Sequence, residues 1–148
     1  MVIEGIVEQG KHLGRTLGFP TANVRPEAVS GEWPENGVYA AALWPEGERA
    51  RLCMLNQGVH PTLPEGKPTI EAHLIDYQGD LYGRPVRVEY LHFLRPERRF
   101  SDVEALRAQL LRDREEVCAW LDAAMLAENP DPAQARARRI AWADRPGE

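Results

Sequence analysis

Two oxygen-bearing side chains, Thr21 and Asn23, stand two residues apart in the sequence. Because Pro20 disfavours a helix at this point, residues 21–24 are expected to run extended, with Thr21 and Asn23 on the same side. A neutral hydroxyl and an amide oxygen at that spacing suit Mg²⁺, which usually keeps several waters and takes further oxygens from a substrate phosphate. The same pattern also fits a polar strand face that binds nothing.

A glycine-containing turn precedes this pair of residues. Gly10 and Gly14 would let a ligand approach the backbone closely, and Arg15 supplies a forked cation that suits a phosphate. A phosphate-binding loop is one interpretation of this segment. A simple connecting turn is the other.

Glu71 and His73 alternate with apolar residues, so the two share one face of a strand expected over residues 69–76. A carboxylate beside a bound alcohol can act as a general base during group transfer. The alternative is a solvated outer face of a sheet, on which His73 has only a structural role. The pattern alone leaves both interpretations open.

Two further groups of polar residues follow. Asp76 and Tyr82 belong to an expected hairpin turn, and Arg95, Arg98 and Phe100 join the last expected strand to a helix. Cations beside an aromatic ring at such a junction could hold a planar ligand that carries an anionic group. A surface charge cluster would have the same composition.

The elements that must position these residues are mostly strands. Alternating apolar residues bounded by turn residues predict strands over residues 2–8, 38–44, 50–56, 69–76 and 86–93. Residues 25–37 contain two prolines and two glycines, which indicate an ordered loop. Short strands without intervening helices predict an antiparallel barrel or sandwich.

The hydrophobic period changes after residue 100. Ser101 and Glu104 form a capping box, with Ser101 as the N-cap of a helix that runs to about residue 126. Asp113 falls on the apolar stripe of this helix, where a carboxylate is costly unless paired, so we expect an internal ion pair, a cap or a ligand role. The stripe comprises Val103, Leu106, Leu110, Val117 and Leu121. We expect one domain over residues 1–128 and a C-terminal extension over 129–148 that could include a short helix.

The composition excludes several classes of protein. The chain has 148 residues and a formal net charge of −5, and this acidic balance argues against general nucleic-acid binding. No stretch approaches the roughly 18–20 apolar residues of a membrane span. The first residues lack the pattern of a secretory signal, and Cys53 and Cys118 form no metal-binding motif. These features predict a cytoplasmic protein with two buried free thiols.

Several motifs follow one another along the chain. They are Gly-Phe-Pro-Thr-Ala-Asn at 18–23, Asn-Gly-Val-Tyr-Ala at 36–40, Asn-Gln-Gly at 56–58, Glu-Ala-His-Leu-Ile-Asp-Tyr at 71–77 and Leu-Arg-Pro-Glu at 94–97. Together they resemble riboflavin kinase, both the C-terminal module of bacterial bifunctional riboflavin kinase/FAD synthetases and the stand-alone eukaryotic enzymes. The likeness covers roughly residues 2–125, and the first motif is its most specific part.

The resemblance implies a six-stranded antiparallel Greek-key β-barrel with a C-terminal helix. It also implies a kinase that uses ATP and Mg²⁺ to convert riboflavin to FMN. By resemblance, Thr21 and Asn23 would hold Mg²⁺ and the nucleotide phosphate, and Glu71 would be the catalytic base.

The remaining ligand contacts are also implied by the resemblance alone. A flap over the ATP phosphates would include Gly10, Gly14 and Arg15. The nucleotide would lie near Leu74, Asp76 and Tyr82. The flavin side would include Arg95, Arg98 and Phe100.

The sequence departs from the family pattern in two ways. Gln57 stands where many bacterial members have a small or aliphatic residue. The chain also begins at the kinase, without the adenylyltransferase module of the bifunctional relatives. We therefore expect either a monofunctional enzyme or an excised domain, and in both cases no formation of FAD.

Other functions remain to be distinguished from this one. A flavin kinase with another nucleotide donor, a flavin-binding regulatory barrel without turnover and an oligonucleotide-binding barrel are the alternatives. The acidic balance and the lack of a basic, aromatic strand face argue against the last of these. We expect a monomer whose partners are riboflavin or FMN and ATP or ADP, with no nucleic acid and no membrane.

Overall fold

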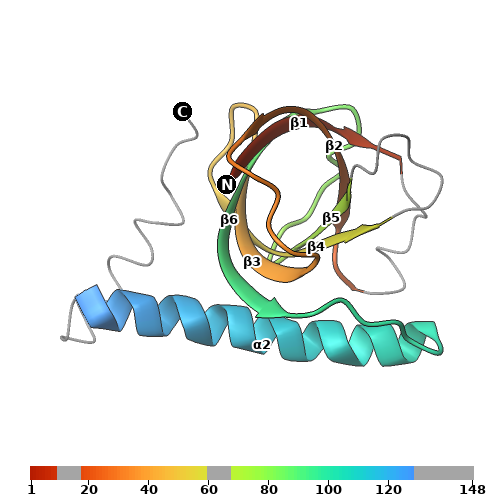
Figure 1. The fold of residues 1–148 in the computed structure, drawn as a ribbon, viewed down its shortest axis with the longest axis vertical. Helices are drawn as coiled ribbons and strands as arrows, with labels where there is room; N and C mark the ends of the chain where they lie inside the picture. Colours follow the sequence, from red (N-terminus) through yellow and green to blue (C-terminus); the bar gives the residue numbers. More distant parts are fainter. Residues whose placement is uncertain (10–17, 60–67, 129–148) are drawn as a thin grey trace.

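In the residues that the computed structural model describes (1–9, 18–59 and 68–128), six strands form a closed antiparallel barrel and one long helix lies against its outside (Figure 1). The strands are β1 (Val2–Glu8), β2 (Thr21–Ser30), β3 (Gly37–Pro45), β4 (Arg51–Val59), β5 (Pro68–Leu74) and β6 (Pro85–Arg95). The helix is α2 (Val103–Glu128).

The strands follow the order β1-β2-β5-β4-β3-β6 around the barrel, and β6 pairs with β1 to close it. Strands β3, β4 and β5 are successive neighbours, and β6 returns to lie beside β3, which is a Greek-key arrangement. The barrel expected from the resemblance is confirmed, and closure leaves no free sheet edge among these strands.

The prediction of a loop over residues 25–37 is wrong for its first half, because β2 continues to Ser30. Pro26 lies opposite Gly5 of β1, next to a register shift between Glu4 and Gly5. A bulge is one of the few places where a strand accepts proline, since no ladder hydrogen bond is needed there. A side chain at Gly5 would collide with the Arg25 carbonyl oxygen, so glycine is required for this close pairing.

The barrel interior is filled by alternate apolar residues from every strand, and β5 contributes Ile70, Ala72 and Leu74. Cys53 is fully buried there, and this burial raises the pKa of its thiol to about 12. Cys118 on α2 is only half-buried, so the prediction of two buried thiols holds for Cys53 alone.

Gln57, the residue that departs from the family pattern, lies at one end of the interior with only 1% of its surface exposed. Its Nε2 donates to the Pro34 carbonyl oxygen at 2.8 Å and to Asn36 Oδ1 at 3.1 Å. Its Oε1 accepts from the Tyr90 hydroxyl at 2.8 Å. Gln57 therefore joins the segment before β3 to the inside of the barrel, and every polar atom of its amide has a partner.

Helix α2 lies along the outside of the barrel (Figure 1). Leu110 and Val117 of the helix pack there with Ala40 of β3 and Met54 of β4. The expected stripe is buried at Leu110, Val117 and Leu121, but Val103 is 37% exposed. Among the described residues, no helix combines the length and apolar character that crossing a membrane needs.

The N-cap of α2 is Asp102 rather than the predicted Ser101. Asp102 Oδ1 accepts a hydrogen bond from the Ala105 backbone N–H at 2.7 Å, and the helix begins at Val103. Both residue types cap well, so the sequence pattern could not choose between neighbours. The short helix expected within residues 129–148 lies outside the described residues.

Candidate active site

The register of three strands gathers polar side chains on the outer face of the barrel. Asn23 on β2 lies opposite Glu71 on β5, and Glu71 lies opposite Asn56 on β4. Two residues further along β2 and β5, Thr21 lies opposite His73. Because side chains alternate along a strand, all five point away from the apolar interior.

Thr21 and His73 are in direct contact. Thr21 Oγ1 lies 2.9 Å from His73 Nδ1 and 3.3 Å from the Phe19 carbonyl oxygen. His73 is only 6% exposed, because its strand face is covered rather than solvated. Burial lowers the pKa of the imidazole to about 4, an effect that the negative charge of Asp113 partly opposes. His73 is therefore uncharged near neutral pH.

Glu71 is half-buried between two asparagines of the neighbouring strands. One of them, Asn56, donates from Nδ2 to Glu97 Oε1 at 3.4 Å. An added side chain at Gly58 would meet the same Glu97 carboxylate, so the Glu97 side chain reaches over β4. Asn56 and Glu97 belong to quoted motifs but were not predicted as site residues. Only the strand register shows that Asn56 lies opposite Glu71, and only the fold brings Glu97 to Asn56.

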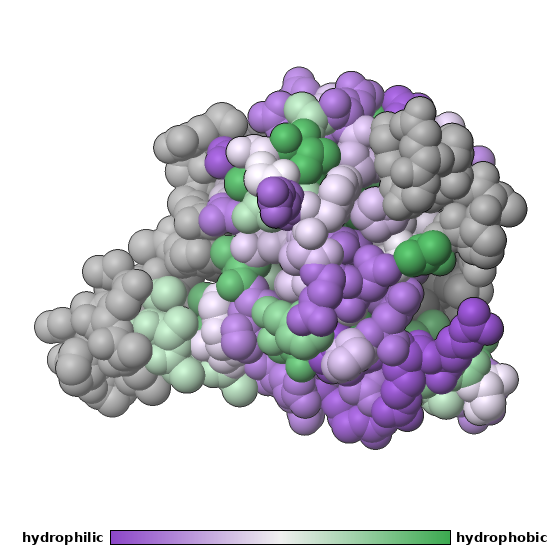
Figure 2. Space-filling model, in the orientation of Figure 1, coloured by the Kyte–Doolittle hydropathy of each residue, from purple (hydrophilic) through white to green (hydrophobic). Residues whose placement is uncertain are grey.

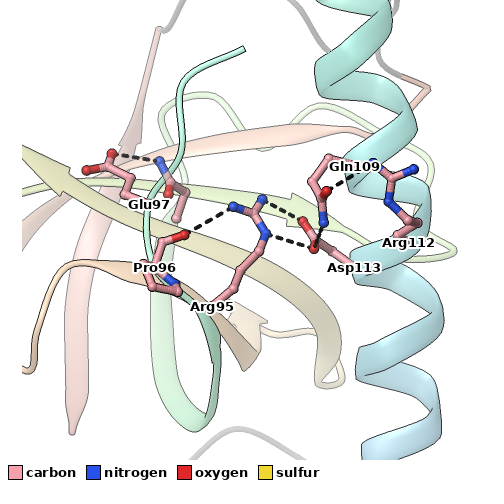
Figure 3. Close-up of polar contacts among 7 residues, drawn as sticks. Arg95, Pro96, Glu97, Gln109, Arg112 and Asp113 are labelled. Atoms are coloured by element: carbon pink, nitrogen blue, oxygen red, sulfur yellow. Dashed lines mark hydrogen bonds and ion pairs between the residues drawn. The ribbon is translucent and has the colours of Figure 1, made fainter.

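The end of β6 is anchored to α2 by an ion pair whose carboxylate is buried (Figure 3). Arg95 donates from Nε to Asp113 Oδ1 at 2.9 Å and from Nη2 to Oδ2 at 2.8 Å. Gln109 Nε2 also donates to Asp113 Oδ1 at 2.9 Å, and the Asp113 side chain is fully buried. The sequence predicted an internal ion pair, a cap or a ligand role for Asp113, and the structure shows the internal ion pair.

Arg95, Arg98 and Phe100 lie together, as a shared ligand surface would require. The guanidinium carbons of Arg95 and Arg98 lie 5.8 Å and 5.1 Å from the centre of the Phe100 ring. The two cations differ, since the fork of Arg95 is occupied by Asp113 while Arg98 is exposed. Hydrophilic residues gather over this segment and the adjoining half of α2 (Figure 2).

The three residues expected near the nucleotide are in different surroundings. Leu74 is buried in the barrel core at 1% exposure, although its backbone N–H donates to the Pro20 carbonyl oxygen at 2.9 Å. Asp76 has a positive φ of 52°, and its Oδ1 accepts from Arg114 of α2 at 3.0 Å. Tyr82 is 57% exposed in the turn before β6.

The flap residues expected from the sequence, Gly10, Gly14 and Arg15, lie outside the described residues. Among the residues that are described, no three His, Cys, Asp or Glu side chains form a metal-binding group. The oxygens of Thr21 and Asn23, on one face of β2, have the hard, neutral character that suits Mg²⁺ held jointly with a phosphate. The donor set is therefore compatible with this ion.

Comparison with known proteins places this barrel in a family. A family profile described as "Flavokinase: Riboflavin kinase" matches residues 1–121. The chain belongs to the riboflavin kinase family. A bifunctional riboflavin kinase/FMN adenylyltransferase of Escherichia coli strain K12 is 42% identical over 112 residues, which are 75% of this chain and 35% of that protein. The RNA-binding riboflavin kinase RibR of Bacillus subtilis strain 168 is 40% identical over 113 residues, 76% of this chain and 47% of that protein.

The chain thus spans less than half the length of these curated riboflavin kinase relatives. Among solved structures, one described as a macrolide-efflux protein from Streptococcus pneumoniae has a TM-score of 0.71 and 29% identity, over 80% of this chain and 38% of that one. A riboflavin kinase from Trypanosoma brucei has a TM-score of 0.56 and 21% identity, over 86% and 83% of the two chains. At that identity, the second likeness supports the fold.

Proposed function

We propose that this chain transfers a phosphoryl group from ATP to the 5′-hydroxyl of riboflavin, giving FMN and ADP. The observation that carries the proposal is the shared outer face of Thr21, Asn23 and Glu71, on paired strands of a barrel from the riboflavin kinase family. Phosphoryl transfer needs little covalent chemistry from the protein, and depends on alignment and on neutralising charge. In this proposal the oxygen ligands hold the Mg²⁺ that neutralises charge, and the carboxylate beside them aligns the attacking hydroxyl.

Each residue of this face has a distinct task in the proposal. Thr21 and Asn23 hold Mg²⁺ and orient the nucleotide phosphates. When bound, Mg²⁺ neutralises charge on the phosphate oxygens. Glu71 accepts the proton of the riboflavin hydroxyl as the new oxygen–phosphorus bond forms, which is general-base catalysis.

The flavin and the nucleotide lie on either side of this face in the proposal. Arg95, Arg98 and Phe100 form the flavin side, with Arg98 and the Phe100 ring as its accessible parts. Asp76 and Tyr82 adjoin the nucleotide, Leu74 contributes through its backbone, and Gly10, Gly14 and Arg15 close over the phosphates. We further propose a cytoplasmic monomer that binds neither nucleic acid nor membrane.

The experiment incubates the purified chain with riboflavin, ATP and Mg²⁺, with and without a chelator, and separates the flavins by chromatography. Chelator-sensitive formation of FMN is the expected result. A folded protein that binds flavin tightly but forms no FMN would contradict the proposal and favour a regulatory barrel. Competition among ATP, CTP and GTP in the same assay identifies the donor.

A further inference from the structure

His73 is a polar side chain at a buried position, where an apolar side chain would avoid the free-energy cost of removing a polar group from water. Its cross-strand neighbours are Thr21 on β2 and the fully buried Met54 on β4. A buried imidazole costs free energy unless its nitrogens find hydrogen-bond partners. The partner that Nδ1 finds is the Thr21 hydroxyl, at 2.9 Å.

We propose that His73 is a positioning residue for Thr21, an inference that rests on the proposed function. In this assignment His73 carries its proton on Nε2, and Nδ1 accepts the hydroxyl proton of Thr21. Both lone pairs of the hydroxyl oxygen are then left for other contacts, so the oxygen can face a cation. His73 acts only through Thr21 and touches neither substrate.

The geometry favours this direction of the hydrogen bond. The single hydroxyl proton of Thr21 has two acceptors within reach, His73 Nδ1 at 2.9 Å and the Phe19 carbonyl oxygen at 3.3 Å. A hydroxyl donor prefers a short distance to its acceptor, so the shorter contact, to His73 Nδ1, is the better hydrogen bond. A protonated Nδ1 would instead occupy a lone pair of the hydroxyl and compete with a metal ion for it.

The surroundings of the pair keep its geometry fixed. His73 is 6% exposed, so little water reaches the imidazole to compete for the hydroxyl proton. Outer-shell groups that orient a metal ligand typically change metal affinity by about 10–100-fold when they are removed. A loss of that size is therefore expected when the Nδ1 acceptor is removed.

His92, an exposed histidine elsewhere on the same outer face, serves as a control variant. Across the strand pairs, His73 aligns with Met54, Ala40 and finally His92 on the same outer face. The His92 ring stacks on Trp120 of α2 at 5.1 Å with an interplanar angle of 9°. Replacing His92 removes an imidazole from this face without changing the contact with Thr21.

The first test uses the ligand-free wild-type protein and does not depend on its activity. Imidazole ¹⁵N spectra distinguish a protonated ring nitrogen from an unprotonated one. Near neutral pH, His73 is expected to have Nε2 protonated and Nδ1 unprotonated. A proton on Nδ1 would overturn the assignment.

The second test measures the affinity for ADP by calorimetry, with and without Mg²⁺. The His73→Leu variant is expected to lose about tenfold or more of the Mg²⁺-dependent affinity. His73→Asn, whose amide oxygen can replace the Nδ1 acceptor, is expected to keep most of it, and His92→Asn all of it. In a Thr21→Ala background, His73→Leu is expected to add little further loss.

The outcomes separate this inference from the proposed function. A wild-type chain that binds no Mg–ADP would overturn both. Wild-type binding with an unchanged Mg²⁺-dependent affinity in folded His73→Leu would overturn the positioning role alone, as would an equal loss with and without the Thr21 hydroxyl. If His73→Leu does not fold, the ¹⁵N spectrum of the wild-type protein decides the question, because a proton on Nδ1 overturns the assignment.

Discussion

The two faces of strands β2 and β5 differ completely in chemistry. The inner face consists of apolar residues that are at most 5% exposed: Ala22, Val24, Ile70, Ala72 and Leu74. The outer face of the same strands carries Thr21, Asn23, Glu71 and His73. An outer face can be polar simply because it meets water, but His73 on this face is only 6% exposed, the same fraction as Tyr39 of the core.

This difference shows that low solvent exposure does not by itself mark a residue of this barrel as a packing residue. The inner face follows from packing, since an apolar interior excludes water and stabilises the closed sheet. The outer face includes a buried polar group, His73, which the proposed function explains through its contact with Thr21. Substitutions on the two faces are therefore expected to act on different quantities, turnover on the outer face and stability on the inner face.

The largest expected effect is on turnover. Because Gln cannot accept the hydroxyl proton, Glu71→Gln is expected to lower kcat by about 10²–10⁴-fold while both substrates still bind. Steady-state kinetics with a separate binding measurement check this. Glu4→Gln, on an exposed part of β1, is the matched control and should keep normal turnover. A normal kcat in Glu71→Gln would remove Glu71 from the role of base.

The next largest effect is on stability. It concerns two ion pairs that join neighbouring residues of α2 to the barrel and its turns. Asp113 is fully buried against Arg95, whereas the Asp76 side chain, paired with Arg114, is 79% exposed. Asp113→Asn leaves a partly buried guanidinium without its carboxylate and is expected to cost about 3–5 kcal/mol of stability. Asp76→Asn, the matched control, is expected to cost under about 1 kcal/mol. Equal midpoints of urea unfolding for the two variants would contradict this account.

A core substitution tests the inner face. Leu55 is fully buried and lies opposite Ala72 of β5. Leu55→Ala is expected to lower the free energy of unfolding by about 2–5 kcal/mol, because it removes apolar contacts and leaves a cavity. The folded fraction should keep a kcat near that of the wild type. If Leu55→Ala kept the wild-type free energy of unfolding but lost turnover, the assignment of stability to the inner face would be contradicted.

The smallest effect is a pH dependence of stability that arises from His73. Burial lowers its pKa from 6.5 to about 4, so between these values the unfolded chain binds a proton that the folded chain does not. The free energy of unfolding should therefore fall as the pH drops from 6.5 towards 4, by at most about 1.4 kcal/mol per pH unit. Urea unfolding of wild type and His73→Asn at pH 7, 6 and 5 checks this. Identical pH slopes would show that His73 does not titrate as described.

Sequence reasoning identified the class of fold because strand periodicity and the change to a helical period are local signals. It missed the second half of β2, since Pro26 indicates a loop unless the bulge opposite Gly5 is known. It also placed the N-cap one residue early, at Ser101 instead of Asp102. These differences are decided by pairing and local geometry that the residue types do not specify.

The candidate site was predictable only in part, for the same reason. Thr21, Asn23 and Glu71 are recognisable from the motifs that contain them. Their closeness depends on the register between β2 and β5, which no local pattern contains. The burial of His73 and the approach of Glu97 to Asn56 likewise need elements far apart in sequence, so they became visible only in the fold.

The central claim, that the outer face of β2 and β5 binds the metal–nucleotide complex, can be measured directly. With Mn²⁺–ADP as the probe, paramagnetic broadening of side-chain methyl signals falls steeply with distance from the metal ion. The Thr21 methyl signal should broaden first, before those of Ala22 and Ala72 inside the barrel and well before that of Val88 on β6. An unaffected Thr21 signal beside a broadened Val88 signal would contradict the account.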